Sequence, residues 1–433
     1  MISGFSKLNK QAKTKLLKQY VLLDKNQLKL INTSQYSNET IQQVIDEISE
    51  NAISNYSLPF SIAPNFLIND KLYFIPMVIE ESSVVAATSY AAKFWAENGG
   101  FRTNVINTTK NGQIYFGWNG NIAKIKRDFP LIKESLLEVV KPLMSNMVKR
   151  GGGISDIYIE NNYHDGNDYY IIHVDFETVD SMGANFINSC LEIMGAELIS
   201  FIKNKYPEEV SIPEIIMSIL SNYTSDCLVE CYVECDIIKL SQISGNLSPQ
   251  QFAGKFEKAV QIAQENVSRA VTHNKGIFNG IDAVLIATGN DFRAAEANGH
   301  AYAARDGQYK ALTQVEINKN RFRYILRMPL SLGTVGGTTS VHPLAKLALQ
   351  IMQNPTGKEL MQIVSAAGLA SNFAALRSLI TEGIQKGHMK LHLNNILYQL
   401  KTSDKEKTSI KKFFKNQQVS FKAVSDYLEN IRK

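Results

Sequence analysis

Several features are missing from this chain of 433 residues, and each absence excludes a class of protein. The net charge of +5 is small and dispersed, so it does not indicate nucleic-acid binding. No stretch approaches the roughly 20 apolar residues of a membrane span, and the first twenty residues lack the apolar core of a signal peptide. We therefore expect a cytoplasmic protein with neither a membrane nor a nucleic-acid partner.

Two motifs that commonly bind cofactors or metals are also missing. The chain contains no G-x-G-x-x-G fingerprint, so a bound dinucleotide would not lie in a Rossmann unit. No C-x-x-C pair accompanies the three closely spaced cysteines Cys227, Cys231 and Cys235. Their segment alternates with period two, which places the cysteines on one face with Val229 and Val233. We expect a half-buried strand there, and no metal site.

The order of apolar and polar segments predicts a mixed chain with no internal repeats. Residues 5–55 favour helices with polar faces, and an apolar, β-branched run at 72–80 favours a strand that leads into a helix. From about 106 to 220 the pattern changes to that of a separate unit of strands and helices. The expected elements of this unit are strands at GQIYFGW and YYIIHVDFETV and helices at 129–149 and 184–204. Further on, a long amphipathic helix is predicted at 249–271, and the chain after Pro343 is expected to be helical.

The segment from Thr272 to His300 carries the strongest functional signal. Lys275 lies in a glycine-bracketed stretch, and Asp291 follows the nearly uncharged run 281–288. Eight residues span about 26 Å as a strand but about 12 Å as a helix. We favour a helix preceded by a reversing loop at 276–280, which would let the ammonium meet the carboxylate. Such a pair suits the reduction or cleavage of a carbonyl, although a loop lysine and a capping aspartate that never meet fit the pattern equally well.

The segment VDSMGANFIN, residues 179–188, leads from a strand through a glycine-containing turn into a helix. Free backbone N–H groups at such a helix start favour a phosphate, and Gly183 allows a close approach of the backbone. The alternative is that Asp180 simply caps the following helix.

Two further segments carry groups that can transfer protons. Glu80 and Glu81 precede an apolar run, so at least one carboxyl is expected in a poorly solvated place with a raised pKa. The alternative is that both glutamates cap the next helix. His388 follows Gly387 in GHMKLH, with His392 four residues on. Because no third zinc ligand is near, we favour a mobile acid–base histidine.

Seven segments, taken together and in order, resemble one family. ENAIS, EESSVVAA, DSMGAN, THNKGIFNGIDAVLIATGND, HAYAARDGQY, GLASNFAALR and GHMKLH are similar to the class II (bacterial type) 3-hydroxy-3-methylglutaryl-coenzyme A (HMG-CoA) reductases. The likeness runs from about residue 5 to the C-terminus. The stretch from Lys275 to Asp291 is nearly the family consensus.

The resemblance implies a four-electron reduction of HMG-CoA to mevalonate and coenzyme A, through mevaldehyde, with NADPH as the cofactor and NADH possible. By motif, Glu81 would be the acid near the carbonyl and Lys275 the oxyanion stabiliser. Asp291 would hold both in a shared proton network, and His388 would protonate the departing thiolate. The implied substrate contacts are Ser83, Asn222, Arg269 and Asn279. The implied cofactor turn is Asp180, Ser181, Met182, Gly183, Ala184 and Asn185.

The chain departs from the family pattern at a few positions, none of which removes a catalytic side chain. Serine stands at Ser82, Ser181 and Ser371, where proline, alanine and glutamine are common. The choice of NADPH comes from charge. The helix that enters Gly151 carries Lys149 and Arg150, together with Lys141, and has no acidic residue over 139–153.

The resemblance also implies an α+β architecture. A large α-rich domain for substrate binding and dimerisation would comprise 1–106 and 220–376. A small ferredoxin-like, non-Rossmann NAD(P) domain would comprise 107–219, and a C-terminal helical flap 377–433. The expected assembly is a homodimer or a higher homo-oligomer with its active site at the dimer interface. Two alternatives remain open: the same chemistry run in reverse for mevalonate catabolism, and a non-catalytic coenzyme A-binding protein. Retention of the four catalytic side chains argues against the second.

Overall fold

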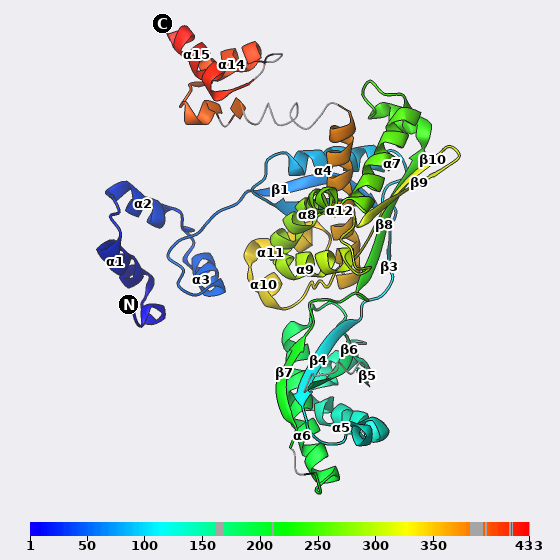
Figure 1. Ribbon diagram of the computed structural model, residues 1–433. Coiled ribbons are helices and arrows are strands. Elements are labelled where there is room, and N and C mark those ends of the chain that lie inside the picture. The colour runs from blue at the N-terminus through cyan, green and yellow to red at the C-terminus, as the bar shows by residue number, and fades with distance from the viewer. Residues whose placement is uncertain are drawn as a thin grey trace.

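The computed structural model describes residues 1–160, 169–209, 212–381, 393–394, 396–414, 417 and 419–432. The chain forms a large central unit, an elongated unit at one end of it, and small helical groups made by the two termini (Figure 1). The described residues form three separate hydrophobic cores, one in the central unit, one in the elongated unit and one near the C-terminus. Helices and antiparallel sheets are mixed throughout.

The elongated unit contains one four-stranded sheet covered on one face by two helices. Its elements are β4 (Lys110–Gly117), α5 (Ile122–Lys149), β5 (Gly153–Ile159), β6 (Tyr169–Glu177), α6 (Ala184–Lys205) and β7 (Glu214–Leu220). The strand order is β5-β6-β4-β7, and each neighbouring pair is antiparallel. Alternate residues such as Ile114, Phe116, Ile172 and Val174 pack against both helices.

The strands and helices predicted for this unit are confirmed, with one change of boundary. Helix α5 begins at Ile122 rather than at 129, because the side chain of Asn121 caps it by accepting from the N–H of Ala123. The helix continues through Pro130 and Pro142.

The central unit is built from two parts of the chain that flank the elongated unit. The first part supplies β1 (Phe60–Ile68), β2 (Lys71–Val78), α4 (Val84–Ala96) and β3 (Arg102–Val105). The second supplies β8 (Leu228–Asp236), η2 (Ile237–Gln242), α7 (Pro249–Glu265), α8 (Val267–Thr288), α9 (Phe292–Ala303), β9 (Thr313–Asn318), β10 (Arg321–Pro329), α10 (Gly337–Val341), α11 (Pro343–Ile351) and α12 (Gly357–Ile380). A hairpin of β1 and β2 accompanies an antiparallel sheet of order β3-β8-β10-β9.

Strand β8 confirms the strand predicted for the cysteine-rich segment. Cys231 and Cys235 are buried in the central core beside Val229 and Val233, and Cys227 is buried just before the strand. Burial raises the pKa of the Cys227 thiol to about 11. Within the described ranges, no three His, Cys, Asp or Glu side chains lie close enough to hold a metal ion.

Helix α12 runs through the middle of the central unit (Figure 1). Within the described part of the chain, it is the one helix long and apolar enough to cross a membrane, although the sequence indicated no such stretch. Most of its apolar window, 72%, is buried inside the protein, which is typical of a core helix. It packs most extensively against α8 and α4.

The glycines of α8 explain why one prediction is wrong. Lys275, Gly276 and Gly280 do not form a reversing loop: all three lie inside α8, which continues through the run 281–288, where a helix was correctly predicted. Gly280 faces α12 so closely that a Cβ there would come within 2.4 Å of the Ala367 carbonyl oxygen. The glycine is needed for helix packing rather than for a turn.

The predicted single helix 249–271 is in fact two. Asn266 adopts an extended conformation between α7 and α8, and its side chain caps α8 by accepting from the N–H of Arg269. A capping asparagine therefore ends one amphipathic pattern and starts the next.

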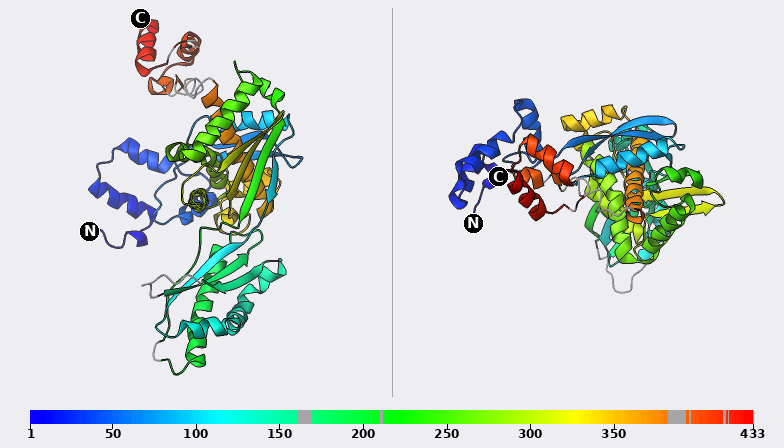
Figure 2. Two further views of the ribbon diagram at one scale, coloured as in Figure 1. Left: turned by 45° about the vertical axis from the view of Figure 1, so that its right-hand side comes forward. Right: turned by 90° about the horizontal axis from the view of Figure 1, so that it is seen from above.

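Both terminal segments are helical and lie on the same side of the molecule, as both views of Figure 2 show. The N-terminal group contains η1 (Phe5–Lys7), α1 (Lys10–Tyr20), α2 (Lys25–Thr33) and α3 (Glu39–Ile48), which confirms the helices predicted for 5–55. The C-terminal group contains α14 (Asp404–Phe413) and α15 (Phe421–Arg432), which share a small core with Leu393, Ile396 and Leu397. His388 lies outside the described residues.

Candidate active site

The centre of the candidate site is an ion pair between Lys275 and Glu81. The Lys275 Nζ, on α8, donates to Glu81 Oε2 at 2.5 Å, and Glu81 lies in the short loop between β2 and α4. The two residues are 194 positions apart, and the packing of α8 against β2 brings them together. Both side chains remain open to solvent, at 59% and 37% exposure. The pair therefore lies at a surface that a substrate can reach.

Asp291 has a different set of contacts from those expected. It is the N-cap residue of α9, where its Oδ1 accepts from the N–H groups of Arg293 and Ala294 at 3.1 Å and pairs with the Arg293 side chain at 3.3 Å. No contact between Asp291 and Lys275 is found in the described structure. Asp291 therefore caps α9, as in the alternative in which the lysine and the aspartate never meet. It lies shortly after the end of α8, the helix that carries Lys275.

The expectation of a buried carboxyl at Glu80 or Glu81 is wrong for this chain. Glu80 is exposed and Glu81 is more than one-third exposed. Neither glutamate caps α4, whose N-cap residue is Ser83.

A different buried carboxyl lies nearby, and the sequence analysis missed it. Asp282 is on α8, about two turns after Lys275, and its Oδ1 is buried with no hydrogen-bond partner. Burial, reinforced by the carboxylates of Glu296 and Glu80, raises the pKa of Asp282 well above the ordinary aspartate value. The available signal was a single acidic residue within an otherwise uncharged helix, Ile277 to Thr288.

Three of the four proposed substrate contacts lie on the elements that carry the ion pair. Asn279 is one turn after Lys275 on the same side of α8, and Arg269 is in the first turn of that helix. Ser83 follows Glu81 and adopts a left-handed conformation, with φ of 75°, at the start of α4. A non-glycine residue held in this region is strained, and such residues gather at ligand sites.

The fourth contact, Asn222, lies beside the turn at 180–185 instead. Asn222 and Met182 line one narrow cavity together with Ala294 and Ala295 of α9. The structure therefore brings the turn, Asn222 and the start of α9 together.

The turn itself ends β6 and begins α6, as predicted. Gly183, with φ of 88°, is the N-cap residue of α6 and is followed by Ala184 and Asn185 in the first helical turn. A Cβ at Gly183 would come within 2.5 Å of the Thr178 side chain. Asp180 does not cap α6: its Oδ1 accepts from the Gly357 N–H at 2.6 Å, at the start of α12. Among the described residues, no side chain caps the first turn of α6.

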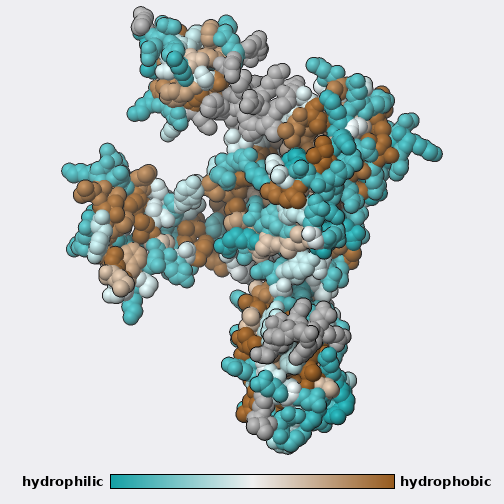
Figure 3. Space-filling view, in the orientation of Figure 1, coloured by the Kyte–Doolittle hydropathy of each residue, from teal (hydrophilic) through white to brown (hydrophobic). Residues whose placement is uncertain are grey.

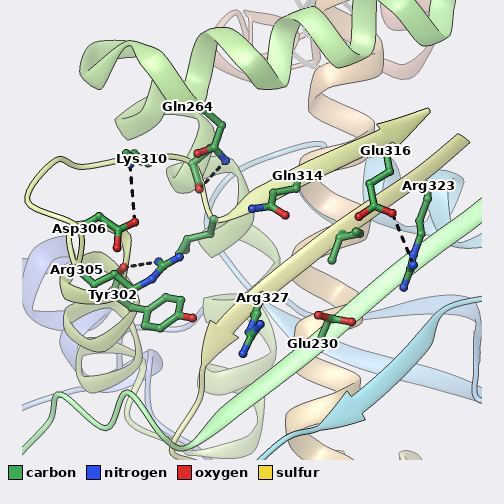
Figure 4. A pocket seen from close by; sticks show the side chains of 13 residues that line it. Glu230, Gln264, Tyr302, Arg305, Asp306, Lys310, Gln314, Glu316, Arg323 and Arg327 are labelled. Atoms are coloured by element: carbon green, nitrogen blue, oxygen red, sulfur yellow. Dashed lines mark hydrogen bonds and ion pairs between the residues drawn. The ribbon is translucent and has the colours of Figure 1, made fainter. Parts of the chain in front are cut away.

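A cavity of about 440 Å³ lies elsewhere, on the face of the β8-β10-β9 sheet that points away from the core (Figure 4). Its charged lining includes two ion pairs, Arg323 with Glu316 at 3.7 Å and Lys310 with Asp306 at 3.8 Å. None of the predicted site residues lines it. The predicted site residues therefore lie around the ion pair and around the turn, and both places are separate from this cavity.

Comparisons with known proteins agree with this geometry. The family model described as hydroxymethylglutaryl-coenzyme A reductase matches residues 9–393. A 3-hydroxy-3-methylglutaryl-coenzyme A reductase of Archaeoglobus fulgidus is 37% identical over 396 residues, which cover 91% of this chain and 86% of the relative. A probable enzyme of the same name from Borreliella burgdorferi is 36% identical over 413 residues, which cover 94% of this chain and 92% of that one.

Solved structures are similar as well. The class II reductase of Streptococcus pneumoniae, bound to NADPH in open conformations, is 37% identical with a TM-score of 0.72, over 88% of this chain and 99% of that chain. A second structure of the Streptococcus pneumoniae enzyme is 36% identical with a TM-score of 0.73, over 99% of both chains.

The mixed fold with its antiparallel sheets is thus that of a class II reductase. The chain belongs to the hydroxymethylglutaryl-coenzyme A reductase family. It is an oxidoreductase of the mevalonate pathway, as the resemblance implied, and HMG-CoA reduction is its activity.

Proposed function

We propose that the chain converts HMG-CoA, with two NADPH and two protons, into mevalonate, coenzyme A and two NADP⁺ at the surface around Lys275 and Glu81. The observation that carries this assignment is the 2.5 Å contact between these two side chains, which are distant in sequence. When bound, the nicotinamide supplies hydride. The protein supplies the charge and the protons.

Lys275 stabilises the negative charge that develops on the thioester oxygen, because its ammonium is held beside the site before reaction begins. Glu81, hydrogen-bonded to that ammonium, lies where it can exchange a proton with the same oxygen. Asn279 and Ser83 flank the pair and orient the acyl group, and Arg269, in the first turn of α8, contributes a cation to substrate binding. We assign Asp291 to the same network through the negative charge that it adds at the start of α9, although it has no contact with Lys275 in the described structure.

The turn from Asp180 to Asn185 holds the cofactor. The residues present fit a dinucleotide, since α6 begins with unpaired N–H groups and Gly183 permits close approach of a diphosphate. The solved relative that carries NADPH supports a nicotinamide cofactor. We assign NADPH rather than NADH, because Lys149 and Arg150 end α5 without an acidic residue near them in sequence.

The order of the elements and the separate cores support the proposed domain organisation. The order strand–helix–strand–strand–helix–strand, with the sheet order β5-β6-β4-β7, supports a ferredoxin-like cofactor domain at 107–219. The larger core supports a substrate domain at 1–106 and 220–376, and the separate small core supports a helical flap at 377–433. His388 of this flap protonates the coenzyme A thiolate as it leaves.

The N-terminal helices support a homodimer. Apolar side chains gather on these helices in the space-filling view (Figure 3), and Leu22, Tyr20 and Leu30 are 101%, 68% and 64% exposed. A second copy of the chain would cover this surface and border the active site. We also propose a cytoplasmic location.

The test is direct. Oxidation of NADPH, followed by its absorbance, is expected only when HMG-CoA is added, with two NADPH consumed for each coenzyme A released. An absence of HMG-CoA-dependent oxidation by folded protein refutes the assignment. Running mevalonate with NADP⁺ and coenzyme A measures the reverse, catabolic direction on the same site.

A further inference from the structure

The turn between β6 and α6 contains a strained residue. Val179 has φ of 56°, in the left-handed region. A β-branched side chain clashes with the backbone there, so valine is a genuine outlier at such an angle. Conformations of this kind persist only when the surrounding structure imposes them, and they gather at ligand sites.

Glu177 imposes the conformation from one side. Its Oε1 accepts from the N–H of Val179 at 2.7 Å. Its Oε2 accepts from the hydroxyl of Thr108, which lies just before β4. One carboxylate therefore ties the strained backbone of the turn to the neighbouring strand.

Lys110 acts on the same turn from β4. Its side chain is buried, at 2% exposure, and its Nζ donates to the Thr178 hydroxyl and to the Ser181 carbonyl oxygen, the latter at 3.1 Å. Burial lowers the pKa of Lys110, while Cys227 and Glu177 act in the opposite direction. Burying an ammonium is costly unless its hydrogen bonds are satisfied. An apolar side chain could fill the same space. The ammonium is therefore retained for its hydrogen bonds to Thr178 and Ser181.

The far side of the turn is fastened to the central unit. The carbonyl oxygen of Asp180 accepts from the N–H groups of Thr334 and Val335, at 2.8 and 3.3 Å. A Cβ on Gly333 would lie 2.5 Å from the Met182 nitrogen, so the two backbones are in direct contact. The turn is thus fixed between the two units and cannot relax by moving away from β4.

We propose that Lys110 and Glu177 are positioning residues for the cofactor. Together they hold Val179 in its strained conformation, so that the first turn of α6 presents its free N–H groups to the diphosphate at a fixed place relative to Lys275. Neither side chain touches the cofactor. This inference rests on the proposed cofactor role of residues 180–185.

The main test replaces Lys110 by methionine, which has similar length and no donor. Lys110→Met is expected to raise the KM and the Kd for NADPH at least tenfold, while the KM for HMG-CoA stays within twofold. The matched control is Lys126→Met, an exposed lysine of α5 in the same unit, with both constants unchanged. Kd is measured by fluorescence titration, and a melting curve confirms folding. Glu177→Met, which keeps the length but can accept neither hydrogen bond, is expected to act in the same way and replaces Lys110→Met if that variant does not fold.

A rescue experiment separates positioning from general stability. Glycine adopts positive φ without strain, so adding Val179→Gly to Lys110→Met is expected to recover most of the lost NADPH affinity. The proposal is overturned if Lys110→Met and Glu177→Met lower only the melting temperature and kcat, with NADPH affinity unchanged, or if Val179→Gly gives no recovery.

A substitution within the turn separates the positioning role of Lys110 from the cofactor role of residues 180–185. Gly183→Val places a side chain against Thr178. If it weakens NADPH binding while Lys110→Met does not, only the positioning role is wrong. If neither variant changes NADPH binding, the turn is not the cofactor site, and the proposed function loses its cofactor assignment as well.

Discussion

The ammonium of Lys275 donates a hydrogen bond of 2.5 Å to the carboxylate of Glu81, from the middle of α8 to the loop before α4. Ion pairs this open to solvent contribute little to stability, because water and salt screen them. The pair is therefore retained for chemistry rather than for folding. Its removal should lower the rate of catalysis without lowering the stability of the fold.

Lys275→Ala is expected to lower kcat by about 10²–10³-fold, since it removes the charge that stabilises the oxyanion. Its melting temperature should stay near that of the unmodified protein, because the side chain is 59% exposed. Lys346→Ala, at an exposed lysine of α11, is the control and should leave kcat unchanged. A loss of only a few-fold at Lys275 would contradict the oxyanion role.

Asp291→Asn tests whether this residue does more than cap α9. Asparagine caps a helix as well as aspartate does, so stability should be retained while the negative charge is lost. We expect kcat to fall nearly as far as in Lys275→Ala. Asp291→Ala removes the cap too and should cost about a further 1 kcal/mol in the free energy of unfolding. Near-normal turnover in Asp291→Asn would leave capping as the sole role of Asp291.

Local patterns predicted much of the fold. The period-two alternation around Cys231 identified β8, and the strand-to-helix change at Gly183 identified β6 and α6, because each pattern depends on near neighbours in sequence.

The reversing loop predicted at 276–280 was wrong because of a contact that is distant in sequence. Gly276 and Gly280 look like loop residues in the sequence, but Gly280 is required by contact with Ala367 of α12, which no local pattern contains. The site residues show the same division between what near neighbours in sequence reveal and what distant contacts decide. The resemblance placed Glu81 with Lys275, whereas buried Asp282 was missed because its environment comes from Glu296 on the next helix and from Glu80.

Asp282→Asn should change how stability depends on pH. The folded state holds the Asp282 proton more tightly than the unfolded state, whose aspartate has a pKa of about 3.9. Folding stability contributed by this group is therefore present at low pH and is lost as the pH rises toward the raised pKa. Asparagine removes the titration. We expect the variant to melt higher than the unmodified protein at pH 8, and to show a smaller difference at pH 5, by calorimetry. Equal differences at both values would contradict the raised pKa.

The preference for NADPH over NADH is tested by reversing a charge at the end of α5. The unmodified enzyme should have a higher kcat/KM with NADPH than with NADH. Arg150→Glu should lower the NADPH value about tenfold and leave the NADH value nearly unchanged, because an acid repels the 2′-phosphate and accepts from a 2′-hydroxyl. Lys126→Glu, near the other end of α5, is the control. A clear NADH preference in the unmodified enzyme would overturn the assignment.

The C-terminal segment should be needed for one half of the reaction only. The central core ends with α12 at Ile380, and the helices after it share a core of their own. A chain ending at Thr381 is therefore expected to fold and to bind HMG-CoA. It should fail in the overall reaction, in which a thiolate must leave, and should still reduce added mevaldehyde, in which none does.

His388→Ala should reproduce that division with less disturbance. A histidine of ordinary pKa near 6.5 can give its proton to a thiolate whose acid has a pKa near 8.5, and alanine cannot. NADPH oxidation with HMG-CoA should fall at least about 10²-fold, the usual contribution of a general acid, while oxidation with mevaldehyde should change by no more than a few-fold. His392→Ala, in the same segment, should retain both activities. If both half-reactions fall equally in His388→Ala, or if the shortened chain does not fold, the segment is part of the general structure and His388 is not the thiolate acid.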